Sequence, residues 1–79
     1  MNLNEACNLI RSIVRNTINT EITIRADDEN NIWKFRIALE NGDIDYLSTI
    51  LRILRRTRFD AIFDSDNAEL VIEEKKEEA

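Results

Sequence analysis

Four arginines within seven positions are the residues of this chain whose type and spacing could do chemistry. They close an amphipathic run from Ile44 to Arg58, in a chain with a formal net charge of −5: Arg52, Arg55, Arg56 and Arg58. Because guanidinium groups bind phosphate through several N–H donors at once, the cluster predicts a contact with a phosphate or with nucleic acid. Cations at the end of a helix also complement the helix dipole, so the same residues have a structural explanation.

Other kinds of chemistry have little support in the sequence. The chain has no histidine, the side chain best suited to general acid–base catalysis near neutral pH. Cys7 falls on the predicted inward side of a helix, where a cysteine acts as a small buried side chain and not as a thiolate. The segment from Asp64 begins like a calcium loop, but Glu69 occupies the sixth position, which requires glycine. We therefore expect no enzyme activity, no catalytic residue, no cofactor and no bound metal.

The composition indicates one small folded domain. The 79 residues are 43% hydrophobic and 34% charged, which is typical of a globular protein with a single core. Residues 1–73 are predicted to form one compact α+β domain, and residues 74–79 a charged, frayed tail. The single cysteine, the absence of a charged leader with an apolar run, and the lack of a long apolar segment predict a soluble, intracellular, cytoplasmic protein outside membranes.

The first half of the chain changes from a helical to a strand period. Apolar residues recur at helical spacing over residues 4–18, and Asn2 or Asn4 can cap that helix. The chain then alternates, a polar turn is expected over residues 27–31, and a second alternating run places Trp33 on a buried face. A helix followed by a β-hairpin with one buried face is the expected result.

The second half repeats this order. Gly42, the only glycine, is expected at a positive φ, and Asp43 is expected to cap the helix that carries the arginines. In that helix Tyr46 is expected to widen the inward stripe. Two more alternating runs, residues 59–64 and 69–73, are separated by a polar turn and predict a second hairpin.

The predicted fold class is α+β, in the order helix-strand-strand-helix-strand-strand. We expect a four-stranded, antiparallel-rich sheet with both helices on one face. The order fits a permuted ferredoxin-like arrangement, in which the first strand of β-α-β-β-α-β has moved to the end. The second and third strands are then parallel, joined by a right-handed crossover, with the last strand between them. A plain meander with both helices packed on it is the alternative.

The sheet face turned away from the helices is the predicted interaction surface, because no segment remains to cover it. Its expected residues are Thr23, Arg25, Lys34, Arg36, Ala38, Asp60, Ile62, Glu69 and Val71. An apolar centre of Ala38, Ile62 and Val71, bordered by charges such as Arg36, resembles the core and rim of a protein interface. The alternative is that isolated Ile and Val residues on an exposed strand reflect β-propensity alone.

These features predict a small, non-enzymatic regulatory or accessory protein that acts through protein–protein interaction. The expected partner is another protein or a second copy, as a homodimer through the exposed sheet face. The alternative is a nucleic-acid-binding regulator that uses the arginine-rich end of the second helix. Arg11 and Arg15 would extend that surface if the two helices lie side by side. No aromatic side chain is interleaved with these arginines, so base stacking is not expected.

Overall fold

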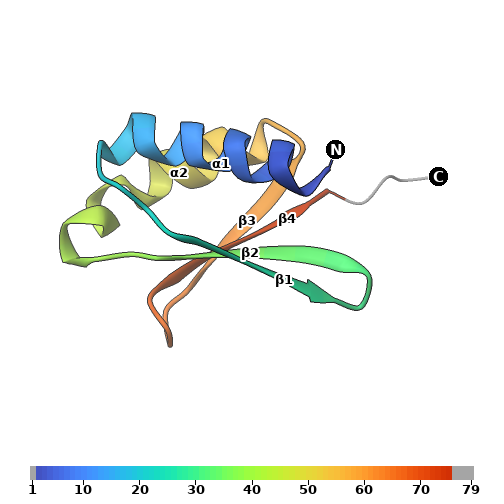
Figure 1. Ribbon diagram of the computed structural model, residues 1–79. Helices are drawn as coiled ribbons and strands as arrows, with labels where there is room; N and C mark the ends of the chain where they lie inside the picture. Colours follow the sequence, from blue (N-terminus) through green and yellow to red (C-terminus); the bar gives the residue numbers. More distant parts are fainter. Residues whose placement is uncertain (1, 76–79) are drawn as a thin grey trace.

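The segments with a helical or a strand period form helices and strands in a computed structural model, which describes residues 2–75 (Figure 1). The elements follow in the order α1 (Leu3–Ile18), β1 (Ile24–Glu29), β2 (Ile32–Ala38), the 3₁₀ helix η1 (Asn41–Tyr46), α2 (Leu47–Arg55), β3 (Phe59–Asp64) and β4 (Glu69–Glu74). The predicted α+β class and the predicted order of elements are confirmed.

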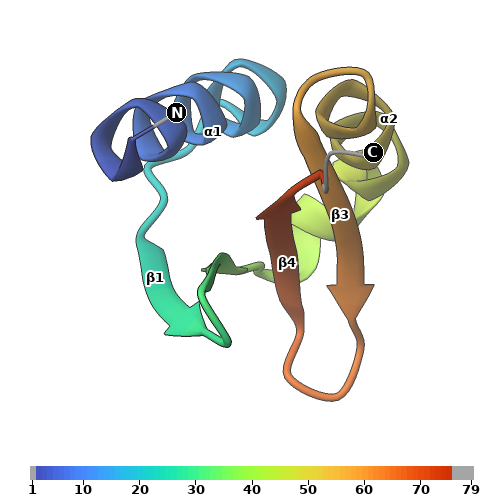
Figure 2. The same ribbon diagram turned by 90° about the vertical axis from the view of Figure 1, so that its right-hand side faces the viewer.

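The four strands form one antiparallel sheet in the order β1-β2-β4-β3. Strand β4 pairs with both β2 and β3, so β2 and β3 run parallel to each other. This order confirms the central position predicted for the last strand, and the meander is wrong. Both helices pack on the same face, α1 on the β1 side and α2 on the β3 side (Figure 2). The opposite face carries no helix within the described residues.

The core lies between the two helices and the sheet. The helices bury Ile10 and Val14 of α1 and Ile50 and Leu54 of α2 against the strand residues Phe35, Ile37, Phe59, Leu70 and Ile72. Burial of one such side chain contributes about 1.5–3 kcal/mol, so the core determines which face of each strand points to the helices. The residues that alternate with them must therefore face away from the core.

Asparagines cap both ends of α1. The Asn2 side-chain oxygen accepts a hydrogen bond from the Glu5 N–H at 2.8 Å. At the other end Asn19 has a φ of 54°, and its N–H donates to the Arg15 carbonyl at 2.7 Å. Because asparagine enters the left-handed region more easily than most residues, it ends the helix at this position. The predicted helix over residues 4–18 agrees with α1 to within one residue.

The β1–β2 hairpin turns on only two residues. Asn30 and Asn31 have φ values of 57° and 66°, as the two central residues of a type I′ turn require. The predicted turn over residues 27–31 is too long, because Asp27 and Glu29 continue β1 and pair with β2. A two-residue turn of this type matches the twist of the flanking strands, so the strands extend up to it.

The segment between β2 and α2 corrects two predictions. Gly42 does not have a positive φ; it lies inside η1. Asp43 does not cap α2, because its carboxylate accepts a hydrogen bond from the Glu40 N–H at 2.9 Å and completes a capping box at the start of η1. This box winds the backbone into a right-handed turn, and therefore no left-handed residue is needed.

Helix α2 is shorter than the amphipathic run over residues 44–58. The run begins as 3₁₀ helix, in which Tyr46 is exposed and not directed inward. At its end the Thr57 N–H donates to the Leu54 carbonyl at 3.0 Å, and the Lys75 ammonium group donates to the Arg55 carbonyl. These bonds satisfy carbonyls that have no partner inside the helix, so the helix ends there.

The C-terminal strand extends beyond the predicted domain boundary at residue 73. Glu74 belongs to β4, and the Lys75 N–H donates to the Arg58 carbonyl at 2.7 Å. The rest of the predicted frayed tail, residues 76–79, lies outside the described residues. No helix in residues 2–75 combines the length and the apolar character needed to cross a membrane.

Candidate functional site

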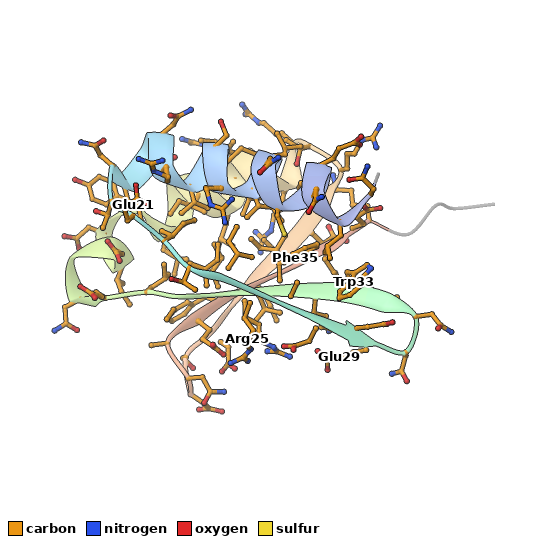
Figure 3. All side chains as sticks on the ribbon, in the orientation of Figure 1. Glu21, Arg25, Glu29, Trp33 and Phe35 are labelled. Atoms are coloured by element: carbon orange, nitrogen blue, oxygen red, sulfur yellow. The ribbon has the colours of Figure 1, made fainter. Side chains whose placement is uncertain are left out.

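The candidate surface is the sheet face opposite the helices. In Figure 3, Trp33 and Phe35 point from the sheet toward the helices, whereas Arg25 and Glu29 point to the other side. The outward residues that alternate with the core are Arg25, Asp27, Glu29, Ile32, Lys34, Arg36, Ala38, Asp60, Ile62, Asp64, Glu69, Val71 and Glu73. This set contains the predicted interface residues Arg36, Ala38, Ile62 and Val71, whereas Thr23 precedes β1.

Trp33 departs from its predicted burial. It lies on the helix side of β2, as the alternation indicates, but it is 41% exposed. Its partner across the hairpin is Asp28, close to the Asn30 turn, whereas the buried Phe35 lies one step further from that turn. The end of the hairpin therefore gives the indole only partial cover.

The strand register changes the predicted apolar centre of the face. Ile62 and Val71 are directly opposite each other, and Arg36 lies on the other side of Val71. Ala38 faces Glu69 in the neighbouring row, so it is not a direct neighbour of the pair. Val71 is 8% exposed between its two long neighbours, whereas Ile62 is 60% exposed. The directly opposed apolar residues are therefore a pair with one strongly exposed member, and Ala38, the third predicted residue, lies one row away on the same face.

Ion pairs cover the β1–β2 half of the face. The Arg36 guanidinium lies 2.9 Å from the Glu29 carboxylate and 3.7 Å from that of Asp27. Arg25 lies 3.1 Å from Asp27 and 3.8 Å from Glu69. Ion pairs between solvent-exposed side chains are a minor source of stability, because water screens the attraction between the charges. Their effect on the surface is that the cations of this half already have partners.

Arg36 is the centre of this network. Its side chain is 20% exposed, less than that of any other cation in the network. The hydrogen bond to Glu29 raises the pKa of the Arg36 guanidinium above its ordinary value, and partial burial acts in the opposite direction. A charged group fixed in this way beside Val71 limits access to the apolar pair from the β2 side.

The β3–β4 half of the face is hollowed. A small hollow of about 80 Å³ is lined by Lys34, Asp60, Ala61, Ile62, Val71 and Glu73. Lys34 lies 3.4 Å from Glu73, and Asp60 forms no ion pair with any described residue. Apolar walls with charged neighbours are the pattern of a small interface core and its rim. Glu73 was missing from the predicted surface, although it stands two residues after Val71 and therefore shares its face.

The arginines at the end of α2 have different roles. The Nε and Nη2 groups of Arg55 donate to the Ala61 carbonyl at 3.1 and 2.8 Å, so this guanidinium belongs to the fold. Arg52 and Arg56 line a shallow surface depression together with Arg55, Ser48 and Leu51. Among the described residues, Arg52, Arg56 and Arg58 form no ion pair. Three of the four predicted arginines thus have guanidinium groups that an external anion could reach.

The arginines of α1 do not extend this cluster. The helices lie side by side (Figure 2), as the predicted stripe requires. However, Arg11 and Arg15 line a depression made by α1 and its C-cap alone, and Arg15 lies 2.9 Å from Glu21. Two separate depressions replace the predicted continuous surface.

Cys7 and Asp64, the other groups considered for chemistry, make contacts that belong to the fold. Cys7 is half-buried and packs against the core cluster. Asp64 accepts hydrogen bonds from the Asn67 side-chain amide at 2.9 Å and from the Asp66 N–H at 3.0 Å. The Asn67 amide is the main cause that lowers the pKa of Asp64 below its ordinary value. Within residues 2–75 no three His, Cys, Asp or Glu side chains are grouped to hold a metal ion.

The chain matches no protein-family model, no curated protein and no solved structure. Its function must therefore be inferred from the surfaces described above.

Proposed function

We propose that this chain is a small, non-enzymatic regulatory or accessory protein that binds a second copy of itself through the β3–β4 half of its exposed sheet face. The observation that carries the proposal is Ile62, a 60% exposed side chain beside a hollow on a face that no described helix covers. An exposed apolar side chain next to a concave surface with charged neighbours is typical of interaction sites.

The patch suits self-association because it contains both a projection and a hollow. In a twofold dimer the same patch is used by both copies, so each Ile62 can approach the hollow of the other copy. The apolar part of the patch is small, and a standard interface takes about 800 Å² per partner from a total surface that is 5485 Å² here. The dimer is therefore expected to be weak and dependent on protein concentration.

The residue chemistry supports a binding role over a catalytic one. The chain has no histidine, and Cys7 packs against the core. Asp27 and Glu29 of the sheet face form ion pairs with Arg36, and Asp64 accepts a hydrogen bond within the β3–β4 turn. A reducing, cytoplasmic location is part of the proposal, because a single half-buried cysteine suits a compartment that keeps thiols reduced.

The test is the solution mass measured by sedimentation as a function of protein concentration. Ile62→Lys is expected to weaken the dimer about tenfold or more, because it replaces the apolar contact with a charge that must be desolvated. Ile44→Lys is the matched control, since Ile44 is also exposed, at 43%, but lies in η1 and not on the sheet face. A wild-type monomer at every concentration, or equal effects of the two variants, would refute the proposal.

A second candidate function is nucleic-acid binding. It is favoured by a specific observation, namely that Arg52, Arg56 and Arg58 lack ion-pair partners among the described residues, whereas the cations on the sheet face all have them. This observation concerns a different surface from the proposed dimer contact, so the two functions are compatible.

A further inference from the structure

The outer surface of α2 differs in charge from the rest of the chain. Residues 46–59 contain four arginines and no acidic residue, although the chain has 16 acidic and 11 basic residues overall. The sheet face has the opposite balance, with three cations, Arg25, Lys34 and Arg36, and six carboxylates: Asp27, Glu29, Asp60, Asp64, Glu69 and Glu73. Within residues 2–75 the outer surface of α2 is therefore locally positive, and the sheet face is negative.

The arginines on this surface are not used by the described part of the fold, with one exception. Arg52 and Arg56 stand one helical turn apart, so both project from the same side of α2, and both line the same depression. Arg55 between them is bound to the Ala61 carbonyl. Cations near the end of a helix complement its dipole through their charge alone, which leaves their N–H donors able to bind an external oxygen.

The chemistry of the surface selects the type of anion. Guanidinium groups at regular spacing bind phosphate oxygens, and a nucleic acid backbone supplies these at regular spacing. The exposed aromatic side chains among the described residues are Trp33 on β2 and Tyr46 in η1, and neither lines the depression. Single-strand binding surfaces rely on stacking of bases on aromatic rings, so this surface fits the backbone of a duplex better.

We propose that Arg52 and Arg56 on the outer surface of α2, with Arg58 after the helix, bind the phosphate backbone of duplex nucleic acid without sequence preference. The contact is independent of the proposed dimer, because it uses the helix layer and not the sheet face. The net charge of −5 opposes approach of phosphate from a distance, so affinity depends on the short-range contacts of the arginines.

The test is fluorescence anisotropy of a labelled duplex DNA of random sequence, titrated with the protein from low to physiological salt. Wild-type protein is expected to bind at low salt and to lose affinity as salt rises. Arg52→Gln/Arg56→Gln is expected to weaken binding about tenfold or more, and to reduce the slope of log affinity against log salt by about 1.8, since each lost phosphate contact removes about 0.9. Arg52→Lys/Arg56→Lys is expected to restore most of the binding, because sequence-independent binding depends mainly on the number of neutralised phosphates and lysine keeps the charge.

The matched control is Arg11→Gln/Arg15→Gln, which removes the same two charges from the separate depression on α1. Its binding is expected to change less than about twofold, since those residues make no proposed phosphate contact. Three results would overturn the inference: absence of wild-type binding at low salt, equal loss in both double variants, or stronger binding of a single strand of equal length. A fourth is a lower solution mass of Arg52→Gln/Arg56→Gln, which would assign the surface to a second protein copy.

Discussion

The Arg55 guanidinium bridges α2 and the edge strand β3 by donating two hydrogen bonds, at 3.1 and 2.8 Å, to the carbonyl oxygen of Ala61. The ladder between β3 and β4 continues through the bond from the Lys75 N–H to the Arg58 carbonyl. Because antiparallel strands alternate between residues that bond their partner and residues that do not, Ala61 directs its backbone groups to the open edge. Arg55 thus occupies a carbonyl to which another strand could pair.

Replacing Arg55 with alanine is expected to lower the free energy of unfolding by about 1 kcal/mol, because a partly buried, charge-assisted pair of hydrogen bonds is lost. It should also increase aggregation on prolonged incubation, since the edge of β3 becomes accessible. Urea denaturation measures the first effect and light scattering the second. Arg52→Ala is the control, because Arg52 is a neighbouring arginine without such a bond. Equal behaviour of the two variants would remove the protective role of Arg55.

A second prediction compares the replacement of alanine by glycine at two positions, one in a left-handed conformation and one in a β-strand. Ala68 has a φ of 52°, a left-handed conformation that costs a residue with a side chain about 1–2 kcal/mol. Its carbonyl accepts a hydrogen bond from the Leu39 N–H at 2.9 Å, which joins this turn to the end of β2. Ala68→Gly is expected to raise the free energy of unfolding by roughly 0.5–1 kcal/mol, after the larger conformational entropy of an unfolded glycine is subtracted.

Ala38→Gly is the matched control. Ala38 lies in β2 as an exposed strand residue, where glycine is expected to lower the free energy of unfolding by about 0.5–1 kcal/mol. Thermal and urea unfolding of both variants gives the two signs directly. A destabilising effect of Ala68→Gly as large as that of Ala38→Gly would show that the left-handed turn carries no strain.

The positions of the helices and strands could be predicted because they follow from patterns within each segment. Alternation placed Ile62 and Val71 on the outer face, and it would have placed Glu73 there as well. The conformation of the turns was less predictable. Gly42 has no positive φ because the Glu40–Asp43 capping box determines the local winding. Ala68 has a positive φ that its residue type does not indicate. Its conformation follows from the turn around it and from the hydrogen bond between its carbonyl and the end of β2.

The details of the candidate site depend on contacts between segments that are distant in the sequence. The register of β4 between β2 and β3 decides that Arg36 and Ile62 flank Val71, and that Ala38 does not. The hydrogen bond from Arg55 to the Ala61 carbonyl depends on how closely α2 approaches the edge of β3. Residue spacing within one segment carries no information on either relationship, so the sequence could identify the surface but not its centre.

A third prediction concerns the turn between β3 and β4 in acid. Hydrogen bonds from the Asn67 amide and from backbone N–H groups lower the pKa of Asp64 below its ordinary value. A carboxyl group whose pKa is lower in the folded state than in the unfolded state stabilises the folded state. This stabilisation is fully present at pH values above the pKa of the unfolded state. This stabilisation is lost as the pH falls through the pKa of the folded state, so the affected range lies below about pH 4.

Asp64→Asn is therefore expected to lower the thermal midpoint at neutral pH, and this difference from the wild type should shrink as the pH falls below about 4. Asp66→Asn is the control, because Asp66 contributes a backbone donor to this turn and its carboxylate accepts none of the bonds described there. Thermal unfolding followed by circular dichroism at several pH values provides the comparison. A difference between Asp64→Asn and wild type that stays constant down to low pH would contradict the electrostatic origin.

The fourth prediction separates the two proposed surfaces by salt. Each sheet face carries three cations and six carboxylates, so two copies that meet through this face repel each other. Added salt screens that repulsion, and the screening length falls to about 10 Å at 0.1 M. Self-association through Ile62 should therefore strengthen as salt rises. Duplex binding through Arg52 and Arg56 should weaken, because the release of counterions into a more concentrated salt solution is less favourable. Sedimentation and anisotropy over one salt series test both trends. If self-association weakens with salt, attraction between opposite charges holds the copies together, as expected when the arginine surface of one copy meets the acidic sheet of another.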